Sequence, residues 1–247
     1  MFFAGVLDVL TMPALGRSLG FTGVELEDIW FPDADRRIVG ELLRRAGQSG
    51  MSVSIAVSND FTVKGKKALR AQVAHTIRFM RMAREAGSDC VRVLMGRKKP
   101  KRERLPQVLE GYYSVLEEAD RLNLCLAIEN HDPLSRDPDV LLEVLYKLAS
   151  KRMGVCLDFG NLDARTRYSA IRQLAPLTLM VHAKTYEFQK NGQERSIDFG
   201  RCFRLLRDAN FDGPVVAEYD GNGDQLLGSL KTKSLVERAM GMKRARP

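Results

Sequence analysis

Short apolar runs alternate with longer stretches of helical periodicity along the whole chain. The apolar runs are five to eight residues long and read as strands buried on both faces. Seven strands are predicted, at residues 23–27, 52–58, 90–96, 124–130, 153–159, 177–184 and 214–220. Helices are predicted between them, at residues 36–50, 66–87, 104–123, 138–150, 169–175 and 199–210.

This alternation of strand and helix predicts a parallel sheet with crossover helices. With at least seven such units in one chain, a closed (β/α)₈ TIM barrel is more economical than an open doubly wound sheet. No Pro/Gly-rich, polar or low-complexity stretch offers a linker between two domains. We therefore expect a single barrel domain over residues 1–247.

Polar side chains gather where the predicted strands end. The spacing is two residues in each of the pairs 129/131, 182/184 and 218/220, so both members of a pair project from the same side of their strand. In barrels the functional groups stand at the carboxyl ends of the strands. The strand-end polar residues are Glu25, Glu27, Asn59, Asp60, Glu129, His131, Asp158, His182, Lys184, Glu218 and Asp220.

Four of these residues, Glu129, Asp158, His182 and Glu218, favour a metal site. Each interrupts an apolar run at a position where a charge would be partly desolvated. Three converging carboxylates would also repel one another and take up protons, and a divalent cation removes both problems. Three oxygen ligands and one imidazole favour one Mn²⁺ or Mg²⁺ ion, with Zn²⁺ or Co²⁺ possible. An octahedral ion would keep two positions for adjacent oxygens of a hydroxy-ketone.

Charge and cysteine content indicate which ligands and which cellular compartment to expect. Lysine and arginine exceed aspartate and glutamate by 39 − 31 = 8, which attracts anions. The basic run at 96–104 follows a strand, so it is expected at the barrel mouth and either binds a substrate phosphate or is a solvated loop. Four widely spaced cysteines indicate a reducing compartment, and no run reaches the length of a membrane span. A soluble, cytoplasmic protein is expected.

The segments "LAIENHD", "GVCLDFGN", "VHAKTYEF" and "IDFGRCFRLLRDANFDGPVVAEYDG" resemble the sugar phosphate isomerase/epimerase family. These are xylose isomerase-like TIM barrels and include endonuclease IV. The resemblance places the family's metal ligands on the same four residues and implies that Glu129 and Glu218 transfer protons through an enediolate. It implies as substrate a small sugar, a polyol or a phosphorylated derivative. Candidates for substrate contact are His131, Lys184, Asn161 and Asn59.

Three alternatives remain open at this stage. Dehydratases and lyases begin with the same enolate-forming step as an epimerase. An endonuclease IV-like abasic-site nuclease would suit the basic charge, but its three-zinc site needs several imidazoles. The chain has only His75, His131 and His182, so nucleic acid is not the expected partner. The third alternative is a barrel that only binds a ligand.

The beginning of the chain supports the third alternative. In relatives, the segment around Pro13 looks like the first helix, and a full strand would precede it. Here only "MFFAG" does, so we expect either a short strand there or a barrel lacking its first strand through truncation. A barrel without that strand exposes two parallel edges, which favours association into a homo-oligomer.

Overall fold

Parallel strands with intervening helices make up both halves of the chain. The computed structural model describes residues 8–31, 36–97 and 101–242. The chain divides into two compact units, the first ending at Gly154 and the second beginning at Val155. Within the residues described, no helix combines the length and the apolar composition needed to cross a bilayer.

The first unit holds four parallel strands. β1 pairs with β2, β2 with β3, and β3 with β4. Leu26, Ile55, Val91 and Leu126 are neighbours in this register, and all four are buried. The elements are α1 (Met12–Ser18), β1 (Gly23–Glu27), α2 (Arg36–Ser49), β2 (Ser52–Ala56), α3 (Lys66–Glu85), β3 (Cys90–Val93), α4 (Leu105–Leu122), β4 (Cys125–Glu129) and α5 (Pro138–Leu148).

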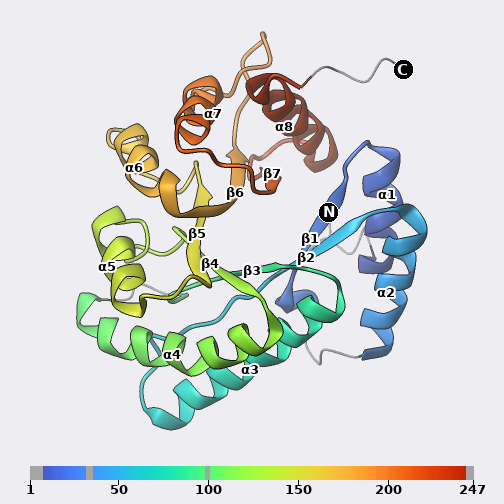
Figure 1. Cartoon of the computed structure of the whole chain (residues 1–247). Helices are drawn as coiled ribbons and strands as arrows, with labels where there is room; N and C mark the ends of the chain where they lie inside the picture. The colour runs from blue at the N-terminus through green and yellow to red at the C-terminus, as the bar shows by residue number, and fades with distance from the viewer. Residues whose placement is uncertain (1–7, 32–35, 98–100, 243–247) are drawn as a thin grey trace. The chain divides into compact units, whose positions relative to one another are not determined.

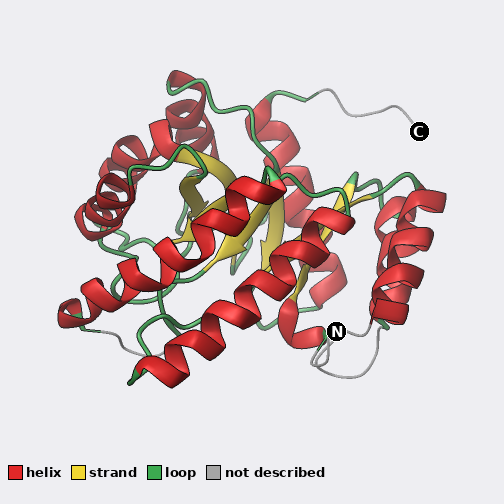
Figure 2. Ribbon diagram, turned by 60° about the horizontal axis from the view of Figure 1, so that its bottom comes forward, coloured by secondary structure: helices red, strands yellow, loops and turns green. Residues whose placement is uncertain are grey.

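Helices α3 and α4 are the two longest elements of this unit, and they lie side by side (Figure 1, Figure 2). Their inward faces are apolar: Phe79 of α3 and Val108 of α4 are fully buried. Tyr112 of α4 is also buried, packs edge-on against Phe61 at 5.0 Å, and donates its hydroxyl to the carbonyl of Leu94. The apolar helix faces and the buried strands thus form one continuous core.

The second unit holds three parallel strands, with β5 pairing with β6 and β6 with β7. Phe159 follows β5 and packs edge-on against Phe199 and Phe203 of α7, at 5.6 Å and 5.5 Å between ring centroids. Figure 1 shows α6, α7 and α8 following one another around these strands. The elements are β5 (Met153–Asp158), α6 (Arg167–Leu174), β6 (Thr178–Thr185), α7 (Phe199–Asp208), β7 (Val215–Tyr219) and α8 (Gln225–Met240).

Four short 3₁₀ turns complete the described secondary structure. They are η1 (Val9–Thr11), η2 (Asp28–Trp30), η3 (Arg102–Arg104) and η4 (Ala175–Leu177).

All seven predicted strands and all six predicted helices are confirmed, but some strands are shorter than expected. The strand predicted at 90–96 ends at Val93. The side chain of Asn59 accounts for this end, because its amide donates to the carbonyl of Leu94 and its oxygen accepts from the amide of Leu94. A side chain therefore takes the place of a neighbouring strand at that point.

Helix α8 was not among the predicted helices. Its inward face carries Gly228, Thr232, Leu235 and Val236, at helical spacing. Two of these four residues, Gly228 and Thr232, do not have large apolar side chains, so the hydrophobic periodicity of the helix is weak. The terminal signals are nevertheless present, since Asp224 caps the first turn and Gly241 follows the last turn in the left-handed conformation.

The described residues contain seven strands, each followed by a helix, which is one strand fewer than a complete (β/α)₈ barrel contains. The segment "MFFAG", on which the question of a short first strand depends, lies outside the described residues. The helix expected around Pro13 is confirmed as α1, with that proline in its first turn.

Candidate active site

Three neighbouring strands of the second unit end in ionisable side chains. Asp158 is the last residue of β5, His182 and Lys184 lie near the end of β6, and Glu218 lies near the end of β7. Asp158 is in register with His182, and Lys184 with Glu218. Because side chains alternate along a strand, His182 and Lys184 share a face. The parallel register therefore brings all four groups together.

The ammonium group of Lys184 lies between the two carboxylates of this cluster. Its Nζ is 2.9 Å from Oδ2 of Asp158 and 3.0 Å from Oε1 of Glu218. His182 approaches from the same strand, with Nδ1 3.4 Å from Oε2 of Glu218. Asp158, His182 and Lys184 are buried, whereas the side chain of Glu218 is 35% exposed. Glu218 is therefore the member of the cluster that solvent reaches.

These contacts fix the charge states of Glu218 and Lys184. Burial on its own would raise the pKa of Glu218, but the hydrogen bond from His182 and the charges of His182 and Lys184 lower that pKa to about 2. Burial would lower the pKa of Lys184, but the charges of Asp158 and Glu218 outweigh it and raise that pKa. Glu218 is thus a carboxylate and Lys184 a cation throughout the neutral range.

The loop after β5 holds Asp158 in place. Oδ1 of Asp158 accepts from the amides of Gly160 and Asn161, at 2.7 Å and 3.2 Å, and Oδ2 accepts from the side-chain amide of Asn161 at 2.6 Å. Gly160 is required by close approach, since a Cβ there would lie 2.8 Å from the hydroxyl of Tyr186 and 2.9 Å from Cδ of Lys184. Asn161 orients Asp158, and its contact with a substrate stays a prediction.

Glu129 ends β4 in the first unit and is buried beside an arginine. Nε of Arg92 is 3.2 Å from Oε2 of Glu129, and Nη2 of the same guanidinium is 2.8 Å from Oε1 of Glu27. Sequence reasoning missed Arg92. The signal for it was one cation inside the otherwise apolar run "CVRVLMG", because a buried arginine requires an anionic partner.

Two other predicted site residues also belong to the first unit. Asn59 is fully buried and is committed to the backbone of Leu94. His131 is exposed just beyond β4. Their contact with substrate stays a prediction. The third histidine, His75, lies in α3 as the helical pattern predicted, with Nε2 2.6 Å from Oδ2 of Asp28.

The basic run at 96–104 is only partly described. Arg102 pairs with Glu143 of α5, and Arg104 donates to the side chain of Gln107. Lys98, Lys99 and Pro100 lie outside the described residues. Phosphate binding by this loop stays a prediction.

The donor set of the second-unit cluster fits a divalent cation. Asp158 and Glu218 offer carboxylate oxygens and His182 an imidazole nitrogen, which suit Mn²⁺ or Mg²⁺ in mixed oxygen and nitrogen sites. Glu129 also offers a carboxylate oxygen. Lys184 already places a positive charge between the two carboxylates of this unit, so the repulsion between these two groups does not by itself require a metal ion.

The chain belongs to the family described as xylose isomerase-like TIM barrel, whose sequence model matches residues 13–241. This match confirms the family resemblance and the barrel class of the fold. A search of curated proteins finds no match.

Solved structures of sugar epimerases share the fold at low sequence identity. D-psicose 3-epimerase from Clostridium cellulolyticum H10, solved with D-tagatose, is 14% identical, with a TM-score of 0.77 over 95% of this chain and 92% of that one. The 3-keto-D-glucoside 4-epimerase from E. coli is 15% identical, with a TM-score of 0.76 over 94% of each chain. A xylose isomerase-like TIM barrel protein from Mycobacterium smegmatis, in complex with magnesium, is 14% identical, with a TM-score of 0.74 over 96% and 90%.

Proposed function

We propose that this protein is a metal-dependent epimerase or isomerase of a sugar or sugar derivative, and that it acts through an enediolate. The observation that carries the proposal is the cluster of Asp158, His182, Lys184 and Glu218 at the ends of three adjacent strands. Membership in the xylose isomerase-like family and the epimerases among the structural neighbours support the same reaction class.

Asp158, His182, Glu218 and Glu129 are the proposed ligands of one divalent ion, with Mn²⁺ or Mg²⁺ preferred. Glu129 is included because the carboxyl ends of strands converge in a TIM barrel. The structural neighbour with magnesium supports the choice of a hard cation. When bound, such an ion polarises a substrate carbonyl and stabilises negative charge on its oxygen.

Glu218 and Glu129 are the proposed pair of proton-transfer groups. Glu218 is held in its ionised form and is partly accessible, so it can accept a proton from the carbon beside the carbonyl. Glu129, which enters this step protonated, then returns a proton to that carbon, and Arg92 orients its carboxyl group. Glu218 afterwards releases its proton to solvent and Glu129 takes one up, so both groups return to their starting states. Lys184 lies close enough to Glu218 to donate a hydrogen bond to a substrate oxygen bound beside that carboxylate.

The endonuclease IV-like alternative would need more imidazoles at the strand ends. His75 is engaged with Asp28 from helix α3, so this imidazole does not add to the donors at the strand ends. A cytoplasmic location is proposed because no disulfide joins the four cysteines, all of which lie in the described part of the chain.

Metal analysis with a matched pair of variants tests the proposal. The wild-type protein, loaded with Mn²⁺ and desalted, is expected to retain about one ion per chain and to turn over at least one ketose or ketose derivative. Asp158→Asn should lose most of the ion and the turnover, whereas Asp163→Asn, an exposed site in the same loop, should keep both. Equal metal content and activity in the two variants would refute the assignment of Asp158.

A further inference from the structure

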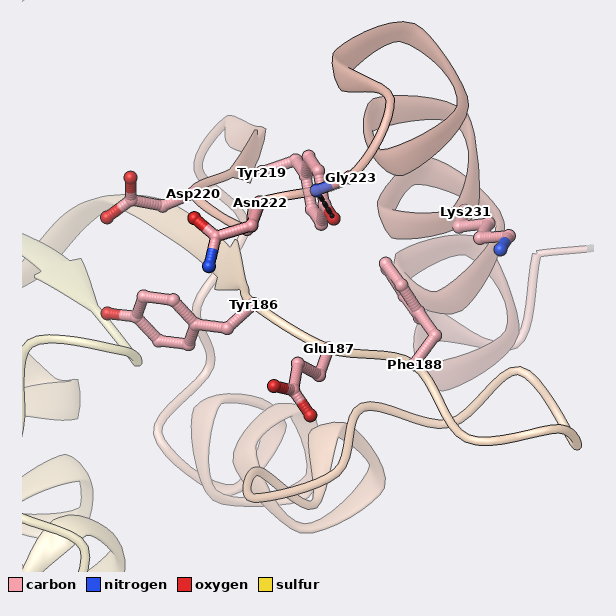
Figure 3. Close-up of a pocket in the computed structure, with 9 residues that line it drawn as sticks. Tyr186, Glu187, Phe188, Tyr219, Asp220, Asn222, Gly223 and Lys231 are labelled. Carbon is pink, nitrogen blue, oxygen red and sulfur yellow. Dashed lines mark hydrogen bonds between the residues drawn. The ribbon is translucent and has the colours of Figure 1, made fainter.

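A cavity of about 380 Å³ lies in the second unit beside the cluster of strand-end residues. It is open to solvent on one side and is lined by the loop after β6, the loop after β7 and Lys231 of α8 (Figure 3). Its volume falls within the range of small-molecule sites in proteins, roughly 300–1,000 Å³. The proposed reaction has not used any of its lining residues.

The cavity and the cluster of strand-end residues are connected through residues adjacent in the sequence. Tyr186 follows Lys184 by two positions, and Tyr219 follows Glu218 directly. The hydroxyl of Tyr186 lies over Gly160, in the space where Cδ of Lys184 also packs. The amide of Asp220 donates to the carbonyl of Thr185 at 2.9 Å, which ties the two loops together. A molecule bound at Glu218 could therefore extend into this cavity.

One wall of the cavity is an aromatic surface. The rings of Phe188 and Tyr219 are stacked, with 6.1 Å between centroids and 25° between planes, and both are partly exposed. The hydroxyl of Tyr219 accepts from the amide of Gly223 at 3.0 Å, and Gly228 packs so closely that a Cβ there would lie 2.1 Å from the ring. The wall is thus held rigid, which lowers the entropic cost of binding a ligand against it.

The other side of the cavity is polar. Figure 3 shows Asp220, Asn222 and Tyr186 on one side, with Phe188 and Lys231 on the other against α8. Neither the carboxylate of Asp220 nor the amide of Asn222 makes a side-chain hydrogen bond with the part of the chain that the structure describes. A carboxylate and an amide two residues apart offer acceptors and donors for neighbouring hydroxyl groups.

The charge of the lining argues against an anionic ligand. Glu187 and Asp220 are acids and Lys231 is the single cation among the lining residues, and the charge of Glu187 is offset by Arg195, whose Nη1 lies 2.6 Å from Oε2 of Glu187. Lys231 also faces the ring of Phe188, with Nζ 5.7 Å from its centroid. A phosphate or carboxylate would meet the carboxylate of Asp220 as well as Lys231 and would gain no net attraction here, whereas an uncharged polyhydroxyl group needs none.

We propose that this cavity is a subsite for an uncharged second sugar ring. The ring would lie against Phe188 and Tyr219 through its apolar face and bind Asp220 and Asn222 through its hydroxyls. The substrate would then be a glycoside or disaccharide derivative whose carbonyl-bearing part is at Glu218, which rests on the proposed function. Free monosaccharides and sugar phosphates would be poorer substrates.

Binding of an unreactive disaccharide tests the subsite without chemistry. Trehalose has no free carbonyl, so its binding can be followed by ligand-detected NMR on the metal-loaded protein. We expect wild type and Tyr146→Ala, a control at an exposed aromatic of α5, to bind trehalose equally well. Phe188→Ala and Asn222→Ala should each weaken binding about 10-fold, roughly one hot-spot contact. Asn222 is exposed, so the second variant tests the subsite even if the first fails to fold.

The outcomes separate this proposal from the proposed function. Failure of wild type to bind trehalose, equal binding by both pocket variants, or displacement of trehalose by inorganic phosphate would each overturn the subsite. Trehalose binding that the pocket variants weaken, without solvent deuterium exchange into any carbonyl sugar, would support the subsite while contradicting the epimerase. Deuterium exchange into free ketoses at the same rate in wild type and both pocket variants, with no trehalose binding, would support the epimerase and contradict the subsite.

Discussion

Lys184 supplies the positive charge of the second-unit cluster. Its ammonium contacts both Asp158 and Glu218, and the lysine and Asp158 are buried. Removing one partner from a buried ion pair is costly because the remaining charges lose their compensation. Lys184 therefore matters to stability as well as to any contact with substrate.

Replacing this lysine should make the stability of the protein depend on metal. Lys184→Met should lower the free energy of unfolding by about 3 kcal/mol after treatment with a chelator, near the lower end of the usual range because Glu218 is partly exposed. Adding Mn²⁺ should restore more stability to this variant than to wild type, as urea unfolding would reveal. Lys233→Met, at a half-buried pair on α8, serves as control. Equal effects of Mn²⁺ on Lys184→Met and wild type would contradict this account.

Asp28 gives the protein a second, pH-dependent contribution to stability. Burial would raise its pKa, but hydrogen bonds from His75 and the amide of Ser58 lower it below 3.8, the ordinary value. A carboxyl with a lowered pKa stabilises the fold above its unfolded-state pKa, and this stabilisation is lost as the pH falls through the folded-state pKa.

Asp28→Asn should accordingly destabilise the protein by about 1–3 kcal/mol near neutral pH. The difference in unfolding free energy between wild type and variant should shrink as the pH falls below 3.8. There the wild-type carboxyl becomes protonated and, like the amide of the variant, uncharged. Urea unfolding of both proteins at a series of pH values measures this, with Asp208→Asn at an exposed site as the control. A difference that stays constant down to the acid limit would argue against the charged hydrogen bonds.

Single residues were predicted from sequence only where they break a pattern. Asp158, His182 and Glu218 interrupt apolar runs, and their positions at strand ends follow from that alone. The sequence could not show that Lys184 would bridge two carboxylates, because this depends on the register between strands. Nor could it show that the side chain of Asn59 would bind the backbone of Leu94.

At the scale of elements, glycine has opposite roles in two helices. Gly228 of α8 packs against the ring of Tyr219, where a Cβ would lie 2.1 Å away. Gly47 of α2 is exposed, and a Cβ there would meet no atom within 4 Å. The first glycine is required by packing, whereas the second only lowers the helix propensity.

Alanine at these two positions should therefore shift stability in opposite directions. Gly228→Ala should cost about 1–3 kcal/mol, because it forces Tyr219 or α8 to move. Gly47→Ala should stabilise the protein by roughly 0.5–1 kcal/mol through helix propensity. Thermal unfolding of the two variants beside wild type gives both values. A stabilising Gly228→Ala would show that α8 does not pack on Tyr219 as described.

Periodicity predicted the elements well because most of them have one clear apolar pattern. Helix α8 escaped prediction because glycine and threonine form half of its buried face. The end of β3 at Val93 depends on hydrogen bonds between the side chain of Asn59 and the backbone of Leu94, which hydrophobic periodicity does not reveal.

For the whole molecule, the order of strands and helices was enough to predict the barrel class, which the family match confirms. The reaction was predicted to the level of a superfamily that contains several chemistries. The charges around Glu218 depend on the register between strands, and the neighbouring cavity is lined by loops whose course the sequence pattern does not determine.

We propose that Glu218 and Glu129 move a proton at a carbon beside a carbonyl. Solvent deuterium exchange tests it most directly, because exchange is detected even where net conversion is small. The Mn²⁺-loaded protein should incorporate deuterium from D₂O into a ketose or ketose derivative. Glu218→Gln and Glu129→Gln should each slow this exchange by roughly 10²–10⁴-fold, and Glu237→Gln on α8 should not. Exchange at the wild-type rate in either of the first two variants would contradict the account.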